Sequence, residues 1–411
     1  MVVPGGAILN PPEARRRIAL FGATGSIGGS ALEVIAERED QFAITALAAG
    51  RNIAALAALA ARWRPCALGV GSADLIPELR ARLAERQVRP EPEIAVGPVG
   101  LRDLAATLDY DVLLLATVGV PGLGAAEAAL RRGKTLALAN KEALVAAGPV
   151  LLRAAERGGG TILPVDSEHS AIHQCLRAGQ RGEVERVILT ASGGPFLDWP
   201  PERLATATPA DALRHPTWRM GRRISTDSAT LMNKGFELLE ACHLFALAES
   251  QVQVLIHPQS IVHSLVAFRD GSVMAQLGTA DMRTPIQYAL TYPAREGTKR
   301  EKLDLAAVAR LEFRVADEGR FRALRLARQA GRAGGAAGAV LNAADEVAVE
   351  AFHAGRLSFP DITTVVEDVL GDLQHLTLNS LEDAQAADLA ARAAAERRVA
   401  AAAARCGGVG R

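Results

Sequence analysis

A glycine-rich turn between a strand-like run and a helix-like run is the feature that most constrains the fold of this 411-residue chain. The turn spans residues 22–28 (GATGSIG). The largely apolar residues 17–21 before it predict a buried strand, and residues 29–38 after it predict a helix. Backbone N–H groups in such a turn point toward an anion beside the positive end of a helix. The glycine spacing is GxxGxxG and not GxGxxG, so the turn predicts a dinucleotide phosphate site, with a plain tight turn as the alternative.

Further apolar runs predict more strands of the same sheet. Residues 42–49, 111–116 and 134–139 are continuously apolar or nearly so, which is typical of parallel strands covered by helices on both faces. Residues 56–64 and 75–85 between them are helix-like. The pattern therefore predicts an N-terminal Rossmann-like domain of the α/β class.

The end of the second predicted strand indicates which cofactor the domain binds. An NAD-binding fold usually places an acidic residue there, but this chain has Gly50, Arg51 and Asn52. A cation at this point attracts a 2′-phosphate, so we expect NADPH in preference to NADH. A surface arginine at an ordinary turn is the alternative.

The strand predicted at 134–139 ends at Asn140, Lys141 and Glu142. Ligands bind beyond the carboxyl ends of the strands in such a sheet. Lys141 could therefore contact a substrate, and Asn140 and Glu142 the nicotinamide end of the cofactor. From the residues alone, a role in capping the next helix is at least as good an interpretation.

Three carboxylates predict a divalent metal site. Asp166 and Glu168 are two residues apart in an extended stretch, so their carboxylates point to the same side and repel unless a cation lies between them. Glu237 shares a predicted helix face with Asn233 and Lys234. Three oxygen ligands suit Mg²⁺ or Mn²⁺ better than zinc. The alternative is a helix cap with acidic residues near the positive helix end.

The histidines of the chain do not predict a second metal site. His169 and His173 are four residues apart, but the chain has no HExxH and no third soft ligand nearby, so we do not expect zinc. We expect the helix to bury one of them and expose the other. His257 and His263 are expected to be hydrogen-bonded residues of a sheet or loop.

Two segments of the middle region predict substrate contacts. Ser192 precedes two glycines and could offer its hydroxyl and free N–H groups to a phosphate. Residues 198–223 are loop-like and carry His215 and Trp218, which predicts a mobile lid, with an ordinary surface excursion as the alternative. A hairpin at residues 270–271 adds an antiparallel part, so this region is expected to be α+β.

Composition excludes several classes of protein. The chain is 49% hydrophobic, 22% charged and formally neutral, which argues against nucleic acid as a partner. No apolar run is long enough to span a bilayer, and the first 17 residues lack the apolar core of a signal peptide, so an extended tail is expected. The four cysteines (Cys66, Cys175, Cys242 and Cys406) form no CxxC pattern, and we expect reduced thiols in the cytoplasm.

The chain is expected to divide into an NADPH-binding Rossmann-like domain (1–165), an α+β catalytic domain with the metal site and lid (166–292), a linker (293–316) and a helical domain (317–411). In the last domain we expect Asn342 to cap a helix that begins beside it. No internal repeat is visible.

Taken together, these motifs resemble the 1-deoxy-D-xylulose 5-phosphate reductoisomerase family. The resemblance is carried, in order along the chain, by residues 22–28, 139–142, 163–169, 192–196, 215–218 with 220–221, 227–235 and 257–260. The family implies NADPH- and metal-dependent rearrangement and reduction of 1-deoxy-D-xylulose 5-phosphate to 2-C-methyl-D-erythritol 4-phosphate, in non-mevalonate isoprenoid precursor biosynthesis. It also implies a homodimer.

The resemblance also implies roles for individual residues. Those expected at the pyrophosphate of NADPH are Thr24, Gly25, Ser26 and Ile27. Those expected at the 2′-phosphate and the rest of the cofactor are Gly50, Arg51, Asn52, Asn140, Glu142 and Gly221. The metal ligands implied are Asp166, Glu168 and Glu237, which together with Lys141 form the catalytic set. The substrate contacts implied are Lys141, Ser167, Glu168, Ser192, His215, Trp218, Ser228, Asn233, Lys234 and Glu237.

Three positions depart from the family pattern. The family often has Ser where Ala23 stands and Lys where Arg51 stands, and it has a smaller lid residue where Arg219 stands. None of the three removes an expected ligand, although Arg219 could alter lid closure.

Two other functions fit part of the pattern. A sugar-phosphate dehydrogenase that reduces without rearranging needs no cluster of three carboxylates. A non-catalytic NADPH sensor predicts the loss of Asp166, Glu168, Glu237 or Lys234, and all four are present.

Overall fold

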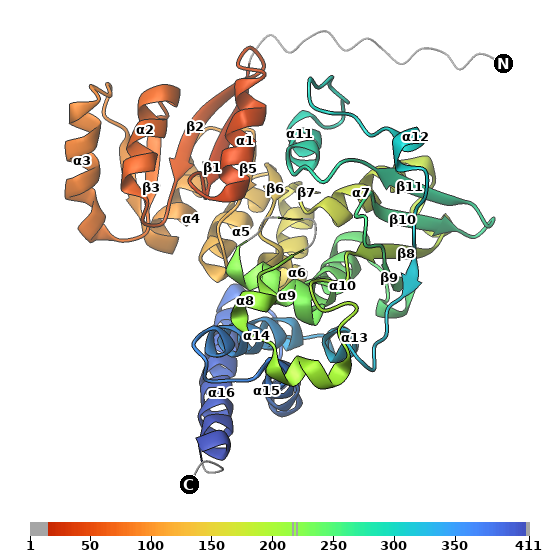
Figure 1. The fold of residues 1–411 in the computed structure, drawn as a ribbon. Helices are drawn as coiled ribbons and strands as arrows, with labels where there is room; N and C mark the ends of the chain where they lie inside the picture. Colours follow the sequence, from red (N-terminus) through yellow and green to blue (C-terminus); the bar gives the residue numbers. More distant parts are fainter. Residues whose placement is uncertain (1–14, 216–217, 219–220, 408–411) are drawn as a thin grey trace, which may run out of the picture.

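The computed structural model describes residues 15–215, 218 and 221–407. Figure 1 shows a first sheet with its helices at the upper left, a second sheet at the right, and the carboxyl-terminal helices α14–α16 below both. The lid residue Arg219 and the predicted amino-terminal tail up to residue 14 lie outside the described residues. The tail was expected to reach residue 17, but residues 16 and 17 begin the first strand.

The first sheet has seven parallel strands in the order β4-β3-β2-β1-β5-β6-β7. Its strands are β1 (Arg16–Phe21), β2 (Phe42–Ala48), β3 (Ala67–Val70), β4 (Glu93–Val96), β5 (Val112–Leu115), β6 (Thr135–Leu138) and β7 (Thr161–Pro164). The connecting helices are α1 (Ser26–Ala36), α2 (Ile53–Trp63), α3 (Ile76–Glu85), α4 (Gly97–Thr107), α5 (Leu123–Arg131) and α6 (Lys141–Gly158). Since β1 pairs with both β2 and β5, the strand order reverses beside β1, and the glycine turn follows β1 at this switch point.

Both faces of this sheet are covered, as its apolar strands predict. Along β1, Ile18 and Leu20 belong to one apolar core, while Ala19 and Phe21 belong to the other. Successive residues of a strand point to opposite faces, so residues 18–21 of β1 are buried against a helix layer on one face or the other, while Arg16 and Arg17 are partly exposed. The predicted Rossmann-like domain is confirmed.

The second sheet has five strands in the order β11-β10-β8-β9-β12. They are β8 (Val184–Ala191), β9 (Val252–Ile256), β10 (Val262–Phe268), β11 (Val273–Leu277) and β12 (Arg314–Val315). The predicted hairpin joins β10 to β11, and an unexpected parallel pair joins β8 to β9. The helices of this region are α7 (Ser167–Cys175), α9 (Arg222–Thr230), α10 (Met232–Phe245) and α11 (Arg283–Thr291), with the short α12 (Leu305–Val308) after them.

The segment expected to be a long loop contains short helices. A 3-10 helix at Pro201–Thr206 and α8 (Pro209–Ala212) interrupt it, and α9 starts at Arg222. Proline in the first turn favours both short helices, because its missing N–H has no partner there in any helix.

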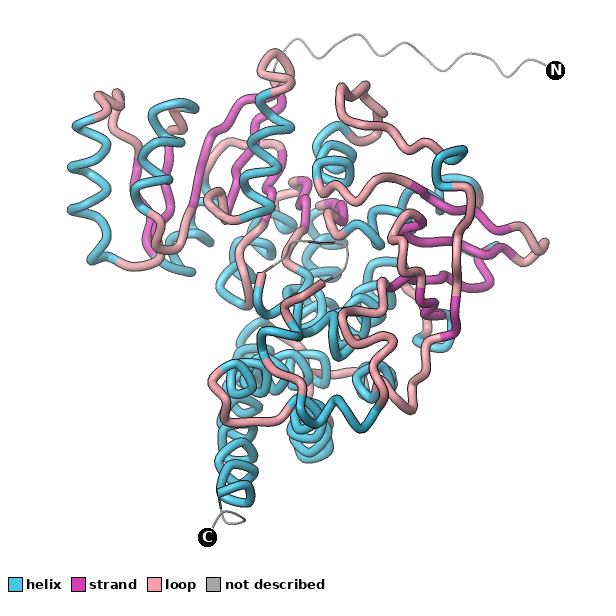
Figure 2. Tube along the Cα trace, viewed as in Figure 1, coloured by secondary structure: helices cyan, strands magenta, loops and turns pink. Residues whose placement is uncertain are grey.

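The carboxyl-terminal region is a helical bundle, as predicted. Figure 2 shows that no strand interrupts α13–α16 in the described part of the chain. The helices are α13 (Arg322–Ala333), α14 (Ala337–His353), α15 (Phe359–Leu373) and α16 (Leu381–Gly407). Among the described residues, none of these or other helices is both long and apolar enough to cross a membrane.

The prediction that Asn342 caps a helix was wrong. Gly334 and Gly335, both with positive φ, separate α13 from α14, which then starts at Ala337. Asn342 therefore lies inside α14 with 1% of its surface exposed. An asparagine is tolerated there because its side-chain oxygen accepts a hydrogen bond from Arg223 at 2.7 Å.

Candidate functional site

Neighbouring strand ends bring the first polar residues together. β6 and β7 pair in parallel with Leu138 opposite Pro164, so the chain leaves both strands at the same edge of the sheet. Beyond β6, α6 begins at Lys141. Beyond β7, the Asp166 side chain accepts the Glu168 N–H at 3.3 Å and caps α7. The expected helix cap is therefore real, and it places Asp166 and Glu168 at the ligand-binding edge.

A left-handed residue brings the third carboxylate to the same place. Leu231, with φ of 61°, ends α9 and redirects the chain into α10. Asn233, Lys234 and Glu237 then lie on one face of α10, as their spacing predicts. Their side chains line the same pocket as Asp166 and Glu168.

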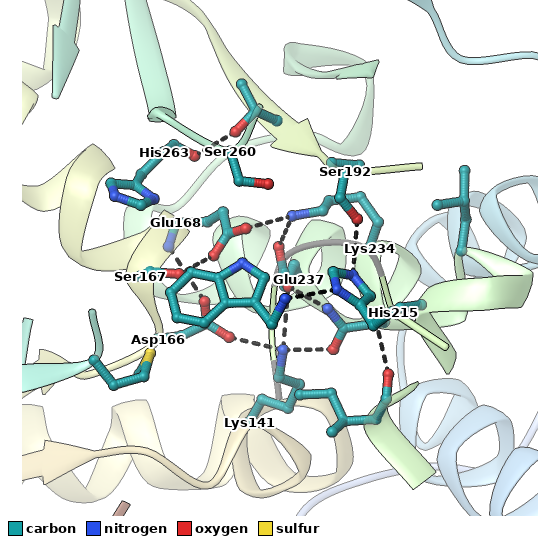
Figure 3. A pocket seen from close by; sticks show the side chains of 18 of the residues that line it. Lys141, Asp166, Ser167, Glu168, Ser192, His215, Lys234, Glu237, Ser260 and His263 are labelled. Carbon is teal, nitrogen blue, oxygen red and sulfur yellow. Dashed lines mark hydrogen bonds and ion pairs between the residues drawn. The ribbon is translucent and has the colours of Figure 1, made fainter. Parts of the chain in front are cut away.

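The three carboxylates form one cluster with two lysines (Figure 3). One oxygen from each of Asp166, Glu168 and Glu237 lies within 4.8 Å of the other two. Lys141 Nζ is 2.7 Å from Asp166 Oδ2 and 3.1 Å from Glu237 Oε1. Lys234 Nζ is 3.0 Å from Glu168 Oε1 and also contacts Glu237.

Burial and the neighbouring charges shift the pKa values of the groups in this cluster. Burial and the neighbouring charge of Glu237 raise the pKa of Glu168 to about 7. Burial alone would raise the pKa of Asp166, but Lys141 and His169 outweigh it and hold that pKa well below its usual value. Burial would likewise lower the pKa of Lys141, but Asp166 and Glu237 keep it well above its usual value. Two ammonium groups thus do not fully neutralise three carboxylates, and the oxygen-only donor set fits a divalent cation such as Mg²⁺ or Mn²⁺.

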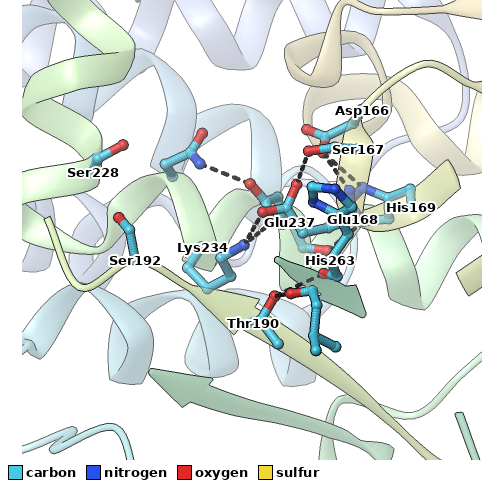
Figure 4. Close-up of polar contacts among 12 residues, drawn as sticks. Asp166, Ser167, Glu168, His169, Thr190, Ser192, Ser228, Lys234, Glu237 and His263 are labelled. Atoms are coloured by element: carbon cyan, nitrogen blue, oxygen red, sulfur yellow. Dashed lines mark hydrogen bonds and ion pairs between the residues drawn. The ribbon is translucent and has the colours of Figure 1, made fainter. Parts of the chain in front are cut away.

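His169 lies behind the carboxylates (Figure 4). Its Nε2 is 2.9 Å from the backbone oxygen of Glu237, and its Nδ1 is 3.2 Å from Glu240 Oε2. His169 is fully buried as one of the two helix histidines was expected to be, whereas His173 is half-buried and contacts the Tyr288 hydroxyl at 2.8 Å. The two rings do not converge on one point, so the HxxxH spacing has a structural explanation.

Ser192 and His215 form a polar wall at one end of the pocket. The Trp218 N–H donates to His215 Nδ1 at 2.9 Å, so in the neutral ring Nε2 carries the proton and donates to Ser192 Oγ at 2.9 Å. Burial lowers the pKa of His215 to about 4, which keeps the ring neutral. Ser192 Oγ also accepts the Gly194 N–H at 3.2 Å, which leaves its own hydrogen available to a ligand. Ser228 and Trp218 line the same pocket.

The glycine turn borders the pocket on the other side. Ser26, Ile27 and Gly221 line it together with the metal-site residues. A Cβ at Gly22 would lie 2.3 Å from the Ala116 oxygen, so the turn can pass this close to β5 only without a side chain. Thr24 and Gly25 belong to the same turn, and Gly25 precedes the first residue of α1.

The remaining expected cofactor residues lie away from this pocket or serve the local structure. Gly50, Arg51 and Asn52 are exposed beyond β2, and Asn52 caps α2. Asn140 caps α6 by accepting the Ala143 N–H at 3.1 Å, as the alternative interpretation has it. Glu142 faces Arg223 at 3.6 Å.

Sequence reasoning gave no role to several residues that line the pocket. Ser260, with φ of 53°, and His263 both border it, and burial lowers the pKa of His263 to about 4. His263 lies in a strand, as expected, and it also lines the pocket, which the sequence did not indicate. His257 matches that expectation, because its Nε2 accepts the Ile261 and Val262 N–H groups. The motif at residues 257–260 was the available signal for Ser260.

Family models match three parts of the chain. The model described as 1-deoxy-D-xylulose 5-phosphate reductoisomerase matches residues 18–148. The 1-deoxy-D-xylulose 5-phosphate reductoisomerase C-terminal domain matches residues 162–245, and the DXP reductoisomerase C-terminal domain matches residues 277–394.

Whole-length relatives agree with these matches. The 1-deoxy-D-xylulose 5-phosphate reductoisomerase of Rhodospirillum centenum is 49% identical over 386 residues, covering 94% of this chain and 95% of the relative. That of Moorella thermoacetica is 51% identical over 378 residues, covering 92% of this chain and 96% of the relative.

Solved structures show the same fold. The reductoisomerase of Zymomonas mobilis in complex with NADPH has a TM-score of 0.87 and 43% identity, covering 94% of this chain and 99% of that one. A DOX-P reductoisomerase in complex with NADPH, fosmidomycin and magnesium has a TM-score of 0.88 and 40% identity, covering 93% of this chain and 98% of that one.

Proposed function

The chain belongs to the 1-deoxy-D-xylulose 5-phosphate reductoisomerase family, and we propose that its central pocket performs the family reaction through the residues named below. The enzyme converts 1-deoxy-D-xylulose 5-phosphate to 2-C-methyl-D-erythritol 4-phosphate and depends on NADPH and a divalent metal ion. One observation carries the assignment of the pocket: three carboxylates from two separate segments meet beside the glycine turn.

Asp166, Glu168 and Glu237 would hold the metal. When bound, a divalent ion supplies Lewis-acid polarisation of the substrate's carbonyl and neighbouring hydroxyl oxygens. Lys141, fixed between Asp166 and Glu237, presents a positive charge to the same region and would stabilise negative charge that develops on a substrate oxygen. Ser167, next to both ligands in sequence, would orient a substrate hydroxyl.

The polar wall of Ser192 and His215 would hold the substrate phosphate together with three further residues of the pocket. These are Ser228, Asn233 and Lys234. Binding energy from a phosphate remote from the reacting carbons can position the substrate for the rearrangement. Trp218 would cover the bound substrate and exclude water.

The glycine turn would hold the cofactor, which supplies the hydride for the reduction. Residues 24–27 would contact its pyrophosphate through backbone N–H groups at the start of α1. Arg51, between Gly50 and Asn52, would bind the 2′-phosphate and so favour NADPH. Asn140, Glu142 and Gly221 would contact the remainder.

We also propose that the protein forms a homodimer, which fits the exposed edge of β11, and that it is cytoplasmic, which fits its free cysteine thiols. β11 is an edge strand with Val273 50% and Met274 41% exposed, and an uncovered apolar edge favours association with a second copy. Cys66, Cys175 and Cys242 are free thiols, which suits a reducing compartment. The division at residues 165, 292 and 316 remains our proposal for the domain boundaries.

The test is an assay with purified protein, 1-deoxy-D-xylulose 5-phosphate, NADPH and either Mg²⁺ or Mn²⁺. We expect NADPH oxidation that stops on chelation of the metal, with 2-C-methyl-D-erythritol 4-phosphate as the product. Reduction without a change in the carbon skeleton would instead support a sugar-phosphate dehydrogenase, and no oxidation with any divalent cation would exclude both activities.

A further inference from the structure

A buried arginine connects the pocket to the carboxyl-terminal bundle. Arg223, in the first turn of α9, donates from Nη2 to Asn342 Oδ1 at 2.7 Å and from Nη1 to Glu346 Oε2 at 3.1 Å. Asn342 and Glu346 both belong to α14, and neither lines the pocket. Only 18% of the Arg223 side chain is exposed, so these contacts are largely shielded from water.

The same guanidinium also faces the pocket helices. Its Nη1 is 3.6 Å from Glu142 Oε1 in the first turn of α6, and its Nε is 3.6 Å from Asp227 Oδ2 on α9. Figure 1 shows α6, α9 and α14 converging below the first sheet. A planar group with five N–H donors can reach three helices at once, which the single ammonium group of a lysine cannot.

Negative charge around Arg223 exceeds its single positive charge. Glu142, Asp227, Asp345 and Glu346 all lie within ion-pair distance of it. Burial and Asp345 raise the pKa of Asp227 well above its usual value, and burial raises the pKa of Asp345 to about 6. Because removing the guanidinium would leave the buried Asp227 and Asp345 without this cation, those carboxyl groups would have to take up protons or the helices would have to move apart.

The helices that Arg223 joins carry pocket residues that are close in sequence either to Arg223 or to its partner Glu142. Lys141 precedes Glu142 at the start of α6. On α9, Gly221 caps the helix, Ile224 follows Arg223, and Ser228 lies one turn further on. Lys141, Gly221, Ile224 and Ser228 all line the pocket. A shift of either helix start would therefore move groups that face the substrate.

We propose that Arg223 is a positioning residue for the reductoisomerase reaction, which fixes the starts of α6 and α9 against α14 and so gives the carboxyl-terminal bundle a part in substrate binding. The proposal rests on the proposed function for its kinetic readout, but the coupling between helices does not. Arg223 acts through other residues and does not itself touch the substrate.

The first test compares Arg223→Met with Arg392→Met. Arg392 on α16 also pairs with Glu346, at 3.0 Å, and with Asp388, and within the described residues its ion pairs and hydrogen bonds go to α14 and α16. We expect Arg223→Met to raise KM for the sugar phosphate about tenfold or more with a smaller change in kcat, because lost positioning of phosphate contacts weakens binding throughout the reaction. Arg392→Met should leave KM within twofold of wild type. An equal rise in both variants, or no rise in Arg223→Met, would overturn the proposal.

The second test places the change on α14. Asn342→Ala removes the shortest contact of Arg223 without changing a residue that lines the pocket. It tests the proposal even if Arg223→Met does not fold. We expect KM to rise at least threefold. In the double variant with Arg223→Met and Asn342→Ala, KM should rise by less than the product of the two single effects, because both substitutions remove the same contact. An unchanged KM in Asn342→Ala would show that the contact between Arg223 and Asn342 does not position the pocket, and would overturn that part of the proposal.

Hydrogen exchange separates this proposal from the proposed function. In the absence of substrate, amides of α9 should exchange at least fivefold faster in Arg223→Met and Asn342→Ala than in wild type, and at the wild-type rate in Arg392→Met. Unchanged exchange of the α9 amides in both Arg223→Met and Asn342→Ala would overturn the coupling. A wild-type protein without turnover, but with the expected exchange pattern, would overturn the proposed function and leave the coupling supported.

Discussion

The ammonium group of Lys141 lies 2.7 Å from a carboxylate oxygen of Asp166, although 24 residues of chain separate them. Both are nine-tenths buried, and each begins or precedes a helix at the carboxyl end of a neighbouring parallel strand. The pair thus joins the nucleotide-binding sheet to the metal ligands. The same lysine also reaches Glu237 of α10, which makes that carboxylate the natural target of a first substitution.

Replacing Glu237 by glutamine should remove one metal ligand while keeping the shape of the side chain. We expect kcat to fall at least about 100-fold, since Lewis-acid stabilisation accounts for several kcal/mol of the barrier, while the dissociation constant for NADPH stays near the wild-type value. Steady-state kinetics and fluorescence titration of NADPH measure the two effects. Glu249→Gln, which changes a carboxylate paired with Arg328 and Arg332 outside the pocket, is the control. Wild-type turnover in Glu237→Gln would remove Glu237 from the ligand set.

Arg51 should set the preference between the two nicotinamide cofactors. Arg51→Ser removes the exposed cation beyond β2, and loss of a charge-assisted contact of about 1.5 kcal/mol should raise KM for NADPH about tenfold. KM for NADH should not change, because that cofactor has no 2′-phosphate. Arg62→Ser, on the exposed surface of the neighbouring helix α2, should leave both values unchanged. Parallel increases for both cofactors would argue against contact with the 2′-phosphate.

The acid pair near Arg223 predicts a defined pH dependence of stability. The pKa of Asp345 is raised from 3.8 to about 6 in the folded protein, so its neutral form is favoured by folding. Its stabilising contribution is complete below about pH 4 and is lost as the pH rises through about 6. Asp345→Asn cannot ionise, and above pH 6 it should melt about 2 °C higher than wild type. The difference should shrink toward pH 4, and a difference that grows there instead would show that the ionised carboxylate is the favoured form.

Two glycine substitutions in helices should change stability in opposite directions. A Cβ at Gly338 of α14 would lie 2.1 Å from the backbone oxygen of Val145 on α6, whereas one at Gly371 of α15 meets open space. Gly338→Ala should therefore destabilise by about 1–3 kcal/mol through overpacking, and Gly371→Ala should stabilise by about 0.5–1 kcal/mol through reduced unfolded-state entropy. Denaturant unfolding of both variants measures the contrast. Equal effects would show that α6 and α14 do not approach this closely in solution.

The carbonyl of Val145 lacks its usual helical partner for an identifiable reason. Pro149, four residues on in α6, cannot donate a hydrogen bond to it, and α6 is kinked at Ala147. Gly338 packs against that carbonyl, so α14 meets α6 at its irregular turn. Proline and glycine are both visible in the sequence, but nothing in their local patterns connects residues 145 and 338.

The sequence predicted the site best where its residues are close along the chain. The helix face of Asn233, Lys234 and Glu237 and the glycine turn each depend on one helix or one turn. The extended backbone expected for Asp166 and Glu168 was wrong, because Glu168 lies in the first turn of α7 and the cap geometry brings the two carboxylates together instead. Periodicity and glycine geometry determine those, because they depend on the backbone torsions of a few consecutive residues. The Rossmann-like sheet follows in the same way from runs of apolar residues.

Only the tertiary structure decided which of these local pieces meet. Ser260 and His263 reach the pocket because β9 and β10 flank β8, and Asn342 became a buried partner of Arg223 and not a helix cap because α14 packs against α9. Contacts between residues more than 100 positions apart depend on how whole helices and sheets bury their apolar faces together. That packing is a collective property of the folded chain, and no short window of sequence contains it.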